Sequence, residues 1–184
     1  FALQSVPHER FTFVSAGNLI PVKNMAELLH AFTALHGEPR LIIFGDGPES
    51  GALRALCAEL GLYSRVSFRG HCPREELAEA YAAADCFVLA SRSETFGVAY
   101  IEAMAAGLPV IATRCGGPED FVTEENGILI PVDDEDALTG AMEHMMLRRE
   151  DYDSAAISAD IRRKFAPETI AARLTELYEG VLSC

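Results

Sequence analysis

Basic side chains are scarce in this sequence: 15 lysine and arginine residues stand against 28 aspartate and glutamate residues, and only two of the 15 are lysines. The formal net charge of −13 argues against a nucleic-acid binder, because phosphate backbones are held by lysine- and arginine-rich surfaces. An anionic membrane surface is disfavoured for the same reason. We therefore expect neither nucleic acid nor membrane among the partners of this chain.

Long apolar runs and paired cysteines are also missing. No apolar run approaches the roughly 20 residues that a membrane-spanning helix needs. The five cysteines are odd in number and form no Cys-x-x-Cys pair, so the sequence predicts neither a disulfide framework nor a zinc site, and a cytoplasmic setting fits them best. The start FALQSVPHER has no initiator methionine and no signal-peptide pattern, which is compatible with a segment of a longer protein.

The 184 residues suffice for one domain, and we interpret residues 1–184 as a single unit. Short β-rich runs alternate with Ala-, Leu- and Glu-rich stretches, which indicates parallel βαβ units. Strands are expected at 10–17, 41–45, 65–70, 85–90 and 109–113, with 127–132 as an additional sixth. Helices are expected at 24–37, with Gly37 as its C-cap, at 50–61, 73–84 and 98–107, from Asp133 or Asp134 through Met145, and at about 154–164 and 167–182. This pattern predicts an α/β fold with a doubly wound, mostly parallel, Rossmann-like sheet and additional C-terminal helices.

In such a fold, ligands bind at the carboxyl ends of the strands. Four of these ends carry glycine-rich or polar segments, at 17–23, 45–48, 70–72 and 91–97. The last segment holds Glu94, and Glu102 follows eight positions later inside a predicted helix, roughly 8 Å along its axis at 1.5 Å per residue. The pair Gly116 and Gly117 is interpreted mainly as a tight turn before a helix.

The start of that predicted helix suits an anion, because its first amides are free and the helix dipole favours negative charge. These amides belong to Phe96, Gly97 and Val98. Carboxylates repel phosphate but accept hydrogen bonds from hydroxyl groups, so Glu94 and Glu102 suit a ligand with hydroxyls at both ends and phosphates between them. A nucleotide diphosphate sugar has this layout. Lys23, which follows the first strand, would neutralise the diphosphate as a point charge.

Three segments resemble a known family: SAGNLIPVKNMAELLHAF, LIIFGDGP and, above all, SRSETFGVAYIEAMAAGLPVIATRCGGPEDFV. They resemble the carboxyl-terminal domain of the family 4, or group 1, retaining glycosyltransferases, which have the GT-B fold. The resemblance extends from about Arg10 to Leu182. It implies that this domain binds a nucleotide-sugar donor, UDP- or GDP-linked, while a preceding domain, absent from this sequence, holds the acceptor.

The resemblance also implies roles for single residues. Glu94 would contact sugar hydroxyls near the reacting centre, and Glu102 would hold the ribose hydroxyls. The backbone of Gly70 and His71 would lie against the base. Lys23 would stabilise the diphosphate leaving group, so that neither a metal nor another cofactor is required.

One residue departs from the family's pattern. Asn18 stands where the family usually has arginine, which removes a bidentate phosphate partner. The site is therefore expected to comprise Glu94 and Lys23 as catalytic residues and, as substrate-binding residues, Gly17, Asn18, Gly70, His71, Phe96, Gly97, Val98 and Glu102. We expect hexosyl transfer with retention of configuration, and hardly any turnover by this domain alone.

Two alternatives come from other classes. The first is an NAD(P)-binding domain of an oxidoreductase, because Gly45-Asp46-Gly47 follows a predicted strand and precedes a helix. The spacing to Gly51 is one residue too long for G-x-G-x-x-G, and Asp46 would put negative charge where a pyrophosphate should sit, so this string is interpreted as a tight turn. The second is a non-catalytic nucleotide-binding module.

Overall fold

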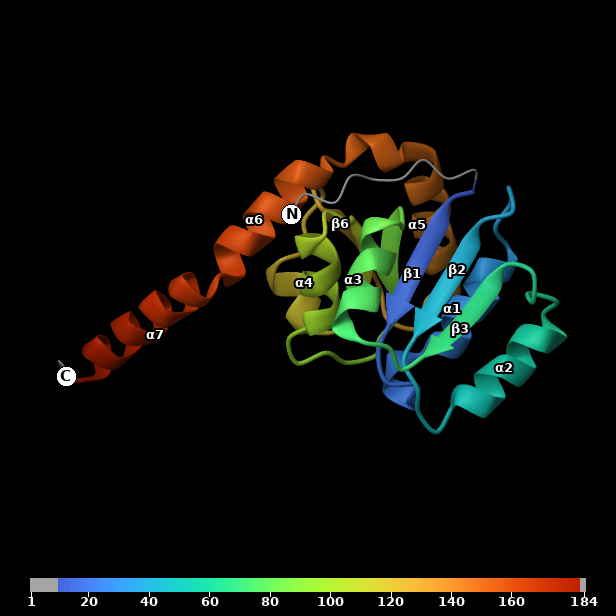
Figure 1. Ribbon diagram of the computed structural model, residues 1–184, viewed down its shortest axis with the longest axis horizontal. Coiled ribbons are helices and arrows are strands. Elements are labelled where there is room, and N and C mark those ends of the chain that lie inside the picture. Colours follow the sequence, from blue (N-terminus) through green and yellow to red (C-terminus); the bar gives the residue numbers. More distant parts are fainter. Residues whose placement is uncertain (1–9, 183–184) are drawn as a thin grey trace.

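The computed structural model describes residues 10–182, so most of the FALQSVPHER start lies outside the described residues. The chain forms a six-stranded parallel sheet covered by helices on both faces (Figure 1). The strands are β1 (Thr12–Ala16), β2 (Arg40–Phe44), β3 (Val66–Gly70), β4 (Cys86–Leu89), β5 (Val110–Thr113) and β6 (Gly127–Ile130). Their order, β3-β2-β1-β4-β5-β6, confirms the predicted doubly wound sheet and its sixth strand. The order reverses between β1 and β4, and ligands bind at such a switch point.

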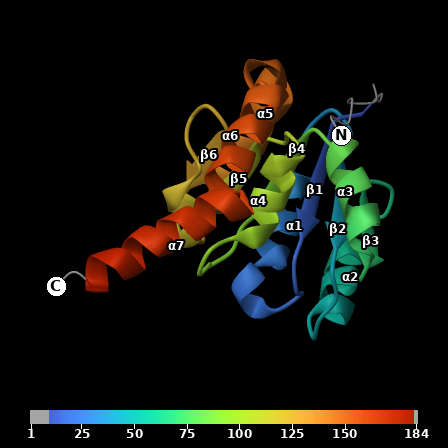
Figure 2. The same cartoon turned by 60° about the vertical axis from the view of Figure 1, so that its left-hand side comes forward.

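Two helical layers enclose the sheet. The helices are α1 (Met25–Thr33), α2 (Ser50–Glu59), α3 (Arg74–Ala82), α4 (Val98–Ala105), α5 (Glu135–Arg148), α6 (Ser154–Phe165) and α7 (Pro167–Leu182), with short 3-10 helices η1 (Pro21–Lys23), η2 (Gly117–Asp120) and η3 (Arg149–Asp151). Helix α1 packs against α2 and α5 on one face, while α4 packs between α3 and α6 on the other. Helix α7 contacts α6 and runs away from the rest of the chain in both views (Figures 1 and 2). Within residues 10–182, no helix has the length and apolar character needed to cross a membrane.

The strands are short and apolar because both of their faces are buried. Every residue of β1, β4 and β5 is buried. Around β4, the Phe87 ring meets Tyr81 of α3 and Tyr100 of α4 edge to face, with ring centroids 5.9 and 5.2 Å apart. These aromatic contacts fix α3 and α4 against the strand that leads into the predicted site.

Most predicted boundaries agree with the structure to within a few residues. Helix α5 begins after Asp134, whose side chain accepts a hydrogen bond from the Ala137 amide at 2.9 Å and caps the helix as expected. The prediction for α1 was wrong at its end, because the helix stops at Thr33 and Ala34 is its C-cap. Gly37 lies in the turn before β2 with a φ of +83°, so it serves the turn rather than the helix.

Candidate functional site

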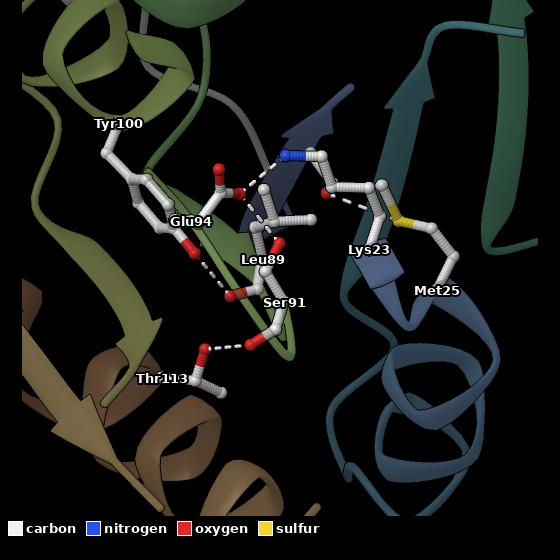
Figure 3. A network of polar contacts seen from close by, with 8 residues as sticks. Lys23, Met25, Leu89, Ser91, Glu94, Tyr100 and Thr113 are labelled. Atoms are coloured by element: carbon white, nitrogen blue, oxygen red, sulfur yellow. Dashed lines mark hydrogen bonds and ion pairs between the residues drawn. The ribbon is translucent and has the colours of Figure 1, made fainter. Parts of the chain in front are cut away.

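The two residues predicted to be catalytic lie on neighbouring loops. Strand β1 pairs with β4, so the loop after β1, which carries Lys23, lies beside the loop after β4, which carries Glu94. The Lys23 Nζ is 2.6 Å from the Glu94 Oε1 (Figure 3). The two side chains are only 19% and 10% exposed, so the ammonium and the carboxylate largely neutralise each other away from bulk solvent.

Glu94 is fixed by its own loop and by the loop after β5. The Ser91 hydroxyl donates to the same Glu94 Oε1 at 2.7 Å. The Glu94 amide donates to the Cys115 carbonyl at 3.0 Å, and the Gly117 amide donates to the Glu94 carbonyl at 2.9 Å. Glycine is required here, because a Cβ on Gly117 would lie 2.5 Å from the Phe96 backbone. The glycine pair therefore does more than make a turn: it lets two loops approach at backbone distance.

Two buried side chains anchor the end of β4. The Tyr100 hydroxyl donates to the Leu89 carbonyl at 2.7 Å, and the Thr113 hydroxyl donates to the Ser91 carbonyl (Figure 3). Burial raises the pKa of Tyr100, so its phenol stays protonated and remains a donor. Helix α4 and strand β5 thus hold the backbone from which the Glu94 loop departs.

Arg92 of the opposite loop holds the short helix that carries Lys23. Residue Lys23 ends η1, and the Arg92 amide donates to the Val22 carbonyl at 2.8 Å. The Arg92 guanidinium donates to the Pro21 carbonyl at 3.2 Å and forms an ion pair with Asp133 at 2.7 Å. Both charged groups of that pair are about half exposed, so its own contribution to stability is small, but the backbone contacts join the two loops.

A cleft of about 520 Å³ opens at the carboxyl ends of the strands. Nine of the ten predicted site residues line it: Gly17, Asn18, Lys23, His71, Glu94, Phe96, Gly97, Val98 and Glu102. Gly70 is not among its lining residues, and its carbonyl accepts a hydrogen bond from the Gly45 amide at 2.7 Å. Residues from the loops after β1, β3 and β4 and from α4 thus surround a single cleft, as a shared ligand would require.

Two features of this cleft leave hydrogen-bonding capacity unused. Within residues 10–182, the amides of Phe96, Gly97 and Val98 have no acceptor, and the exposed Glu102 carboxylate has no hydrogen bond or ion pair. Gly97 precedes α4 with a φ of +87°, a conformation that favours glycine. The arrangement offers donors to an anion at the helix start and an acceptor to a hydroxyl group further along α4.

The Gly45-Asp46-Gly47 turn forms hydrogen bonds and close contacts within the chain. The Asp46 carbonyl accepts from the Leu19 amide at 2.9 Å, and the Gly47 amide donates to the Asp46 side chain at 2.7 Å. A Cβ on Gly45 would lie 1.9 Å from the Gly17 carbonyl oxygen. This packing supports the interpretation as a tight turn and disfavours a pyrophosphate cradle at this loop.

Sequence reasoning missed several residues of the cleft. Leu77 and Tyr81 of α3 and Cys72 before it line the cleft as well. The sequence predicted a helix over 73–84 and assigned no site role to these residues, and Tyr81 packs on Phe87. Burial raises the pKa of Cys72, which makes its thiol a weak nucleophile. In the described part of the chain, no group of three or more His, Cys, Asp or Glu side chains is arranged to hold a metal ion.

Comparisons with known proteins bear on the family and the fold of the chain. A family model described as "Glycosyl transferases group 1" matches residues 3–161. The GDP-mannose-dependent alpha-mannosyltransferase of Mycobacterium tuberculosis (strain CDC 1551 / Oshkosh) is 36% identical over 167 residues, which is 90% of this chain and 42% of that protein.

Two solved structures share the fold. The apo form of the lipopolysaccharide outer core galactosyltransferase WaaB superposes with a TM-score of 0.86 at 23% identity, over 97% of this chain and 52% of that one. The pneumococcal O-GlcNAc transferase GtfA, in complex with UDP and GlcNAc, superposes with a TM-score of 0.82 at 26% identity, over 98% of this chain and 38% of that one. These likenesses confirm a Rossmann-like domain of the GT-B type. The chain spans about half the length, or less, of the relatives it matches.

Proposed function

Because the chain belongs to the glycosyl transferases group 1, we propose that it is the donor-binding part of an enzyme that transfers a hexose from a nucleotide diphosphate sugar. The observation that carries this proposal is the cleft itself, which is lined by Lys23, by the amides of 96–98 and by the Glu102 carboxylate, the amides and the carboxylate having no hydrogen-bond partner among residues 10–182. The relatives support a nucleotide-sugar donor: one is a GDP-mannose-dependent mannosyltransferase, and another is solved with UDP and GlcNAc.

In this proposal the diphosphate lies at the start of α4 and forms an ion pair with the Lys23 ammonium. The Glu94 carboxylate, now paired with Lys23 and Ser91, would then accept hydrogen bonds from sugar hydroxyls. Glu102 would hold the ribose, and the backbone at Gly70 and His71 would lie against the base. Fixed donors of this kind stabilise the negative charge that develops on the departing diphosphate, which is commonly a large part of an enzyme's rate enhancement.

The finer parts of the proposal follow from the family resemblance. Transfer would retain the anomeric configuration and would need no metal, since Lys23 and the helix amides take the place of a cation. A further domain would hold the acceptor, and this domain alone would bind donor but turn it over poorly. The free thiols of Cys57, Cys72, Cys86 and Cys115 support the cytoplasm as the compartment.

The first test is a thermal-shift panel of UDP, GDP, ADP and their sugar conjugates, together with NAD⁺ and NADP⁺. We expect stabilisation by at least one nucleoside diphosphate, because a ligand that binds only the folded state raises the melting temperature. A response to the nicotinamide dinucleotides alone would overturn the proposal in favour of an oxidoreductase. A response to none would favour a non-catalytic module.

Replacing Glu102 by alanine tests the ribose role. We expect the variant to lose about 1.5–3 kcal/mol of affinity for UDP or GDP, the usual range for hydrogen bonds to a charged group. Isothermal titration calorimetry measures the loss. Glu143→Ala, which removes an exposed carboxylate from α5, is the matched control and should bind normally. Unchanged affinity in Glu102→Ala would contradict the ribose role.

Replacing Asn18 by arginine tests the departure from the family's pattern. Asn18 is exposed in the cleft, so a longer side chain fits without disturbing the core. We expect the guanidinium to tighten binding of UDP or GDP by roughly threefold to tenfold through bidentate contact with phosphate. Asn18→Gln, which lengthens the side chain without adding charge, is the control. Weaker binding by the arginine variant would mean that the loop after β1 presents position 18 differently.

A further inference from the structure

One buried polar group near the cleft has no hydrogen-bond partner in the part of the chain that the structure describes. The Tyr81 side chain on α3 is 2% exposed, and within residues 10–182 its hydroxyl oxygen is buried without a hydrogen bond. The Tyr81 ring packs edge to face on Phe87, with centroids 5.9 Å apart, so the ring is held in place. Native proteins satisfy most buried hydroxyls, because an unpaired one costs free energy. An orphan hydroxyl beside a ligand cleft can therefore gain a partner when a neighbouring side chain is oriented by a bound ligand.

The structure places a suitable partner beside it. Tyr81 and Glu102 line the same cleft, and both also border a groove of about 740 Å³ between α3, α4 and α6. Burial raises the pKa of Tyr81, and the nearby Glu102 carboxylate raises it further. The phenol is therefore a donor at every physiological pH, while the carboxylate is an acceptor with no hydrogen bond in the described part of the chain.

The groove makes the orientation of Glu102 important. Arg74 and Arg162 also line this groove, and a Glu102 carboxylate that turned toward either guanidinium would no longer face the cleft. Arg162 already donates to the Ala105 carbonyl at 3.0 and 3.1 Å, so it is held within the groove. A donor at the border between groove and cleft can hold one carboxylate oxygen and leave the other facing the ligand.

We propose that Tyr81 is a positioning residue, whose hydroxyl donates to the Glu102 carboxylate when a nucleotide occupies the cleft and thereby aims that carboxylate at the ribose. The hydroxyl acts through Glu102, because its oxygen is buried from solvent. The inference rests on the proposed function, since it presupposes that Glu102 contacts the nucleotide. Its energetic basis is preorganisation. A glutamate side chain that a second contact already holds loses less conformational entropy when it binds the ligand than a freely rotating one does.

The test is Tyr81→Phe, which keeps the ring and removes only the hydroxyl. In the free chain we expect an unchanged or higher melting temperature, because an unpaired buried group is removed. In calorimetry with UDP and GDP we expect the dissociation constant to rise roughly threefold to tenfold. In a Glu102→Ala background the same change should have less than about a twofold effect. Tyr152→Phe, at a buried tyrosine outside the cleft, is the matched control and should bind normally.

The outcomes separate the inference from the proposed function. A Tyr81→Phe variant that binds like the unsubstituted chain overturns the inference alone, provided that Glu102→Ala binds weakly. The inference also falls if the affinity loss is equally large in the Glu102→Ala background, or if it is accompanied by a lower melting temperature, since either result indicates a merely structural hydroxyl. A chain that binds none of UDP, GDP and ADP overturns the proposed function and the inference together.

Discussion

The Lys23→Met variant should bind UDP and GDP at least a hundredfold more weakly than the unsubstituted chain, a loss of about 2.7 kcal/mol. Two effects add up. The diphosphate loses its only lysine contact in the cleft, and Glu94, whose side chain is 10% exposed, becomes an uncompensated negative charge beside the phosphates. Isothermal titration calorimetry on both proteins measures the difference.

The chain offers a matched control, because Lys164 is the only other lysine. It pairs with Asp160 at 2.7 Å on α6, so Lys164→Met removes the same charge away from the cleft and should leave affinity unchanged. The double variant Lys23→Met, Glu94→Gln removes the uncompensated carboxylate and should recover part of the lost affinity. Normal binding by Lys23→Met alone would contradict the phosphate role of Lys23.

The Gly45→Ala variant should be destabilised by at least about 3 kcal/mol, a large part of the stability of a typical domain. Gly45 has a φ of +119°, where side chains are strained, and an added Cβ would lie 1.9 Å from the Gly17 carbonyl oxygen. Because backbone rather than a flexible side chain is in the way, relief requires the loop after β1 to move. Urea unfolding, followed by circular dichroism, measures the loss of stability.

Gly51→Ala is the control for Gly45→Ala. Gly51 lies in α2, and an added Cβ there would meet no atom within 4 Å. Alanine is the better helix former, so this variant should be neutral or more stable by up to about 1 kcal/mol. If both variants unfolded at the same urea concentration as the unsubstituted chain, the close contact between the loops after β1 and β2 would be refuted.

The fold could be predicted because its signals are local and repeated. Each strand is an apolar run flanked by helical stretches, and that alternation alone specifies a doubly wound sheet. Strand neighbours followed from the usual order of such folds, so the proximity of the Lys23 and Glu94 loops was predictable. The end of α1 was not predictable. A glycine such as Gly37 is typical of a helix C-terminus, but here it lies in the turn before β2, and the helix ends earlier, at Thr33.

The candidate site could be predicted where it depends on a spaced pair of residues, and it could not be predicted where it depends on three-dimensional contacts. The Glu94 and Glu102 spacing, with glycine and the helix start between them, pointed to the cleft. No sequence pattern indicates that Lys23 and Glu94 pair with each other in the free chain, since that depends on side-chain torsions. Tyr81 was equally hidden, because a tyrosine at core spacing gives no sign of whether its hydroxyl finds a partner.

The loops around the cleft are joined by backbone contacts, with Gly45 against Gly17 on one side and Gly117 against Phe96 on the other. Their conformational entropy is therefore lost while the chain folds, and little remains to be lost when a ligand is captured. When an anion binds, the Lys23 ammonium then exchanges its partner, from the Glu94 carboxylate to a phosphate, while the loops that line the cleft stay in place.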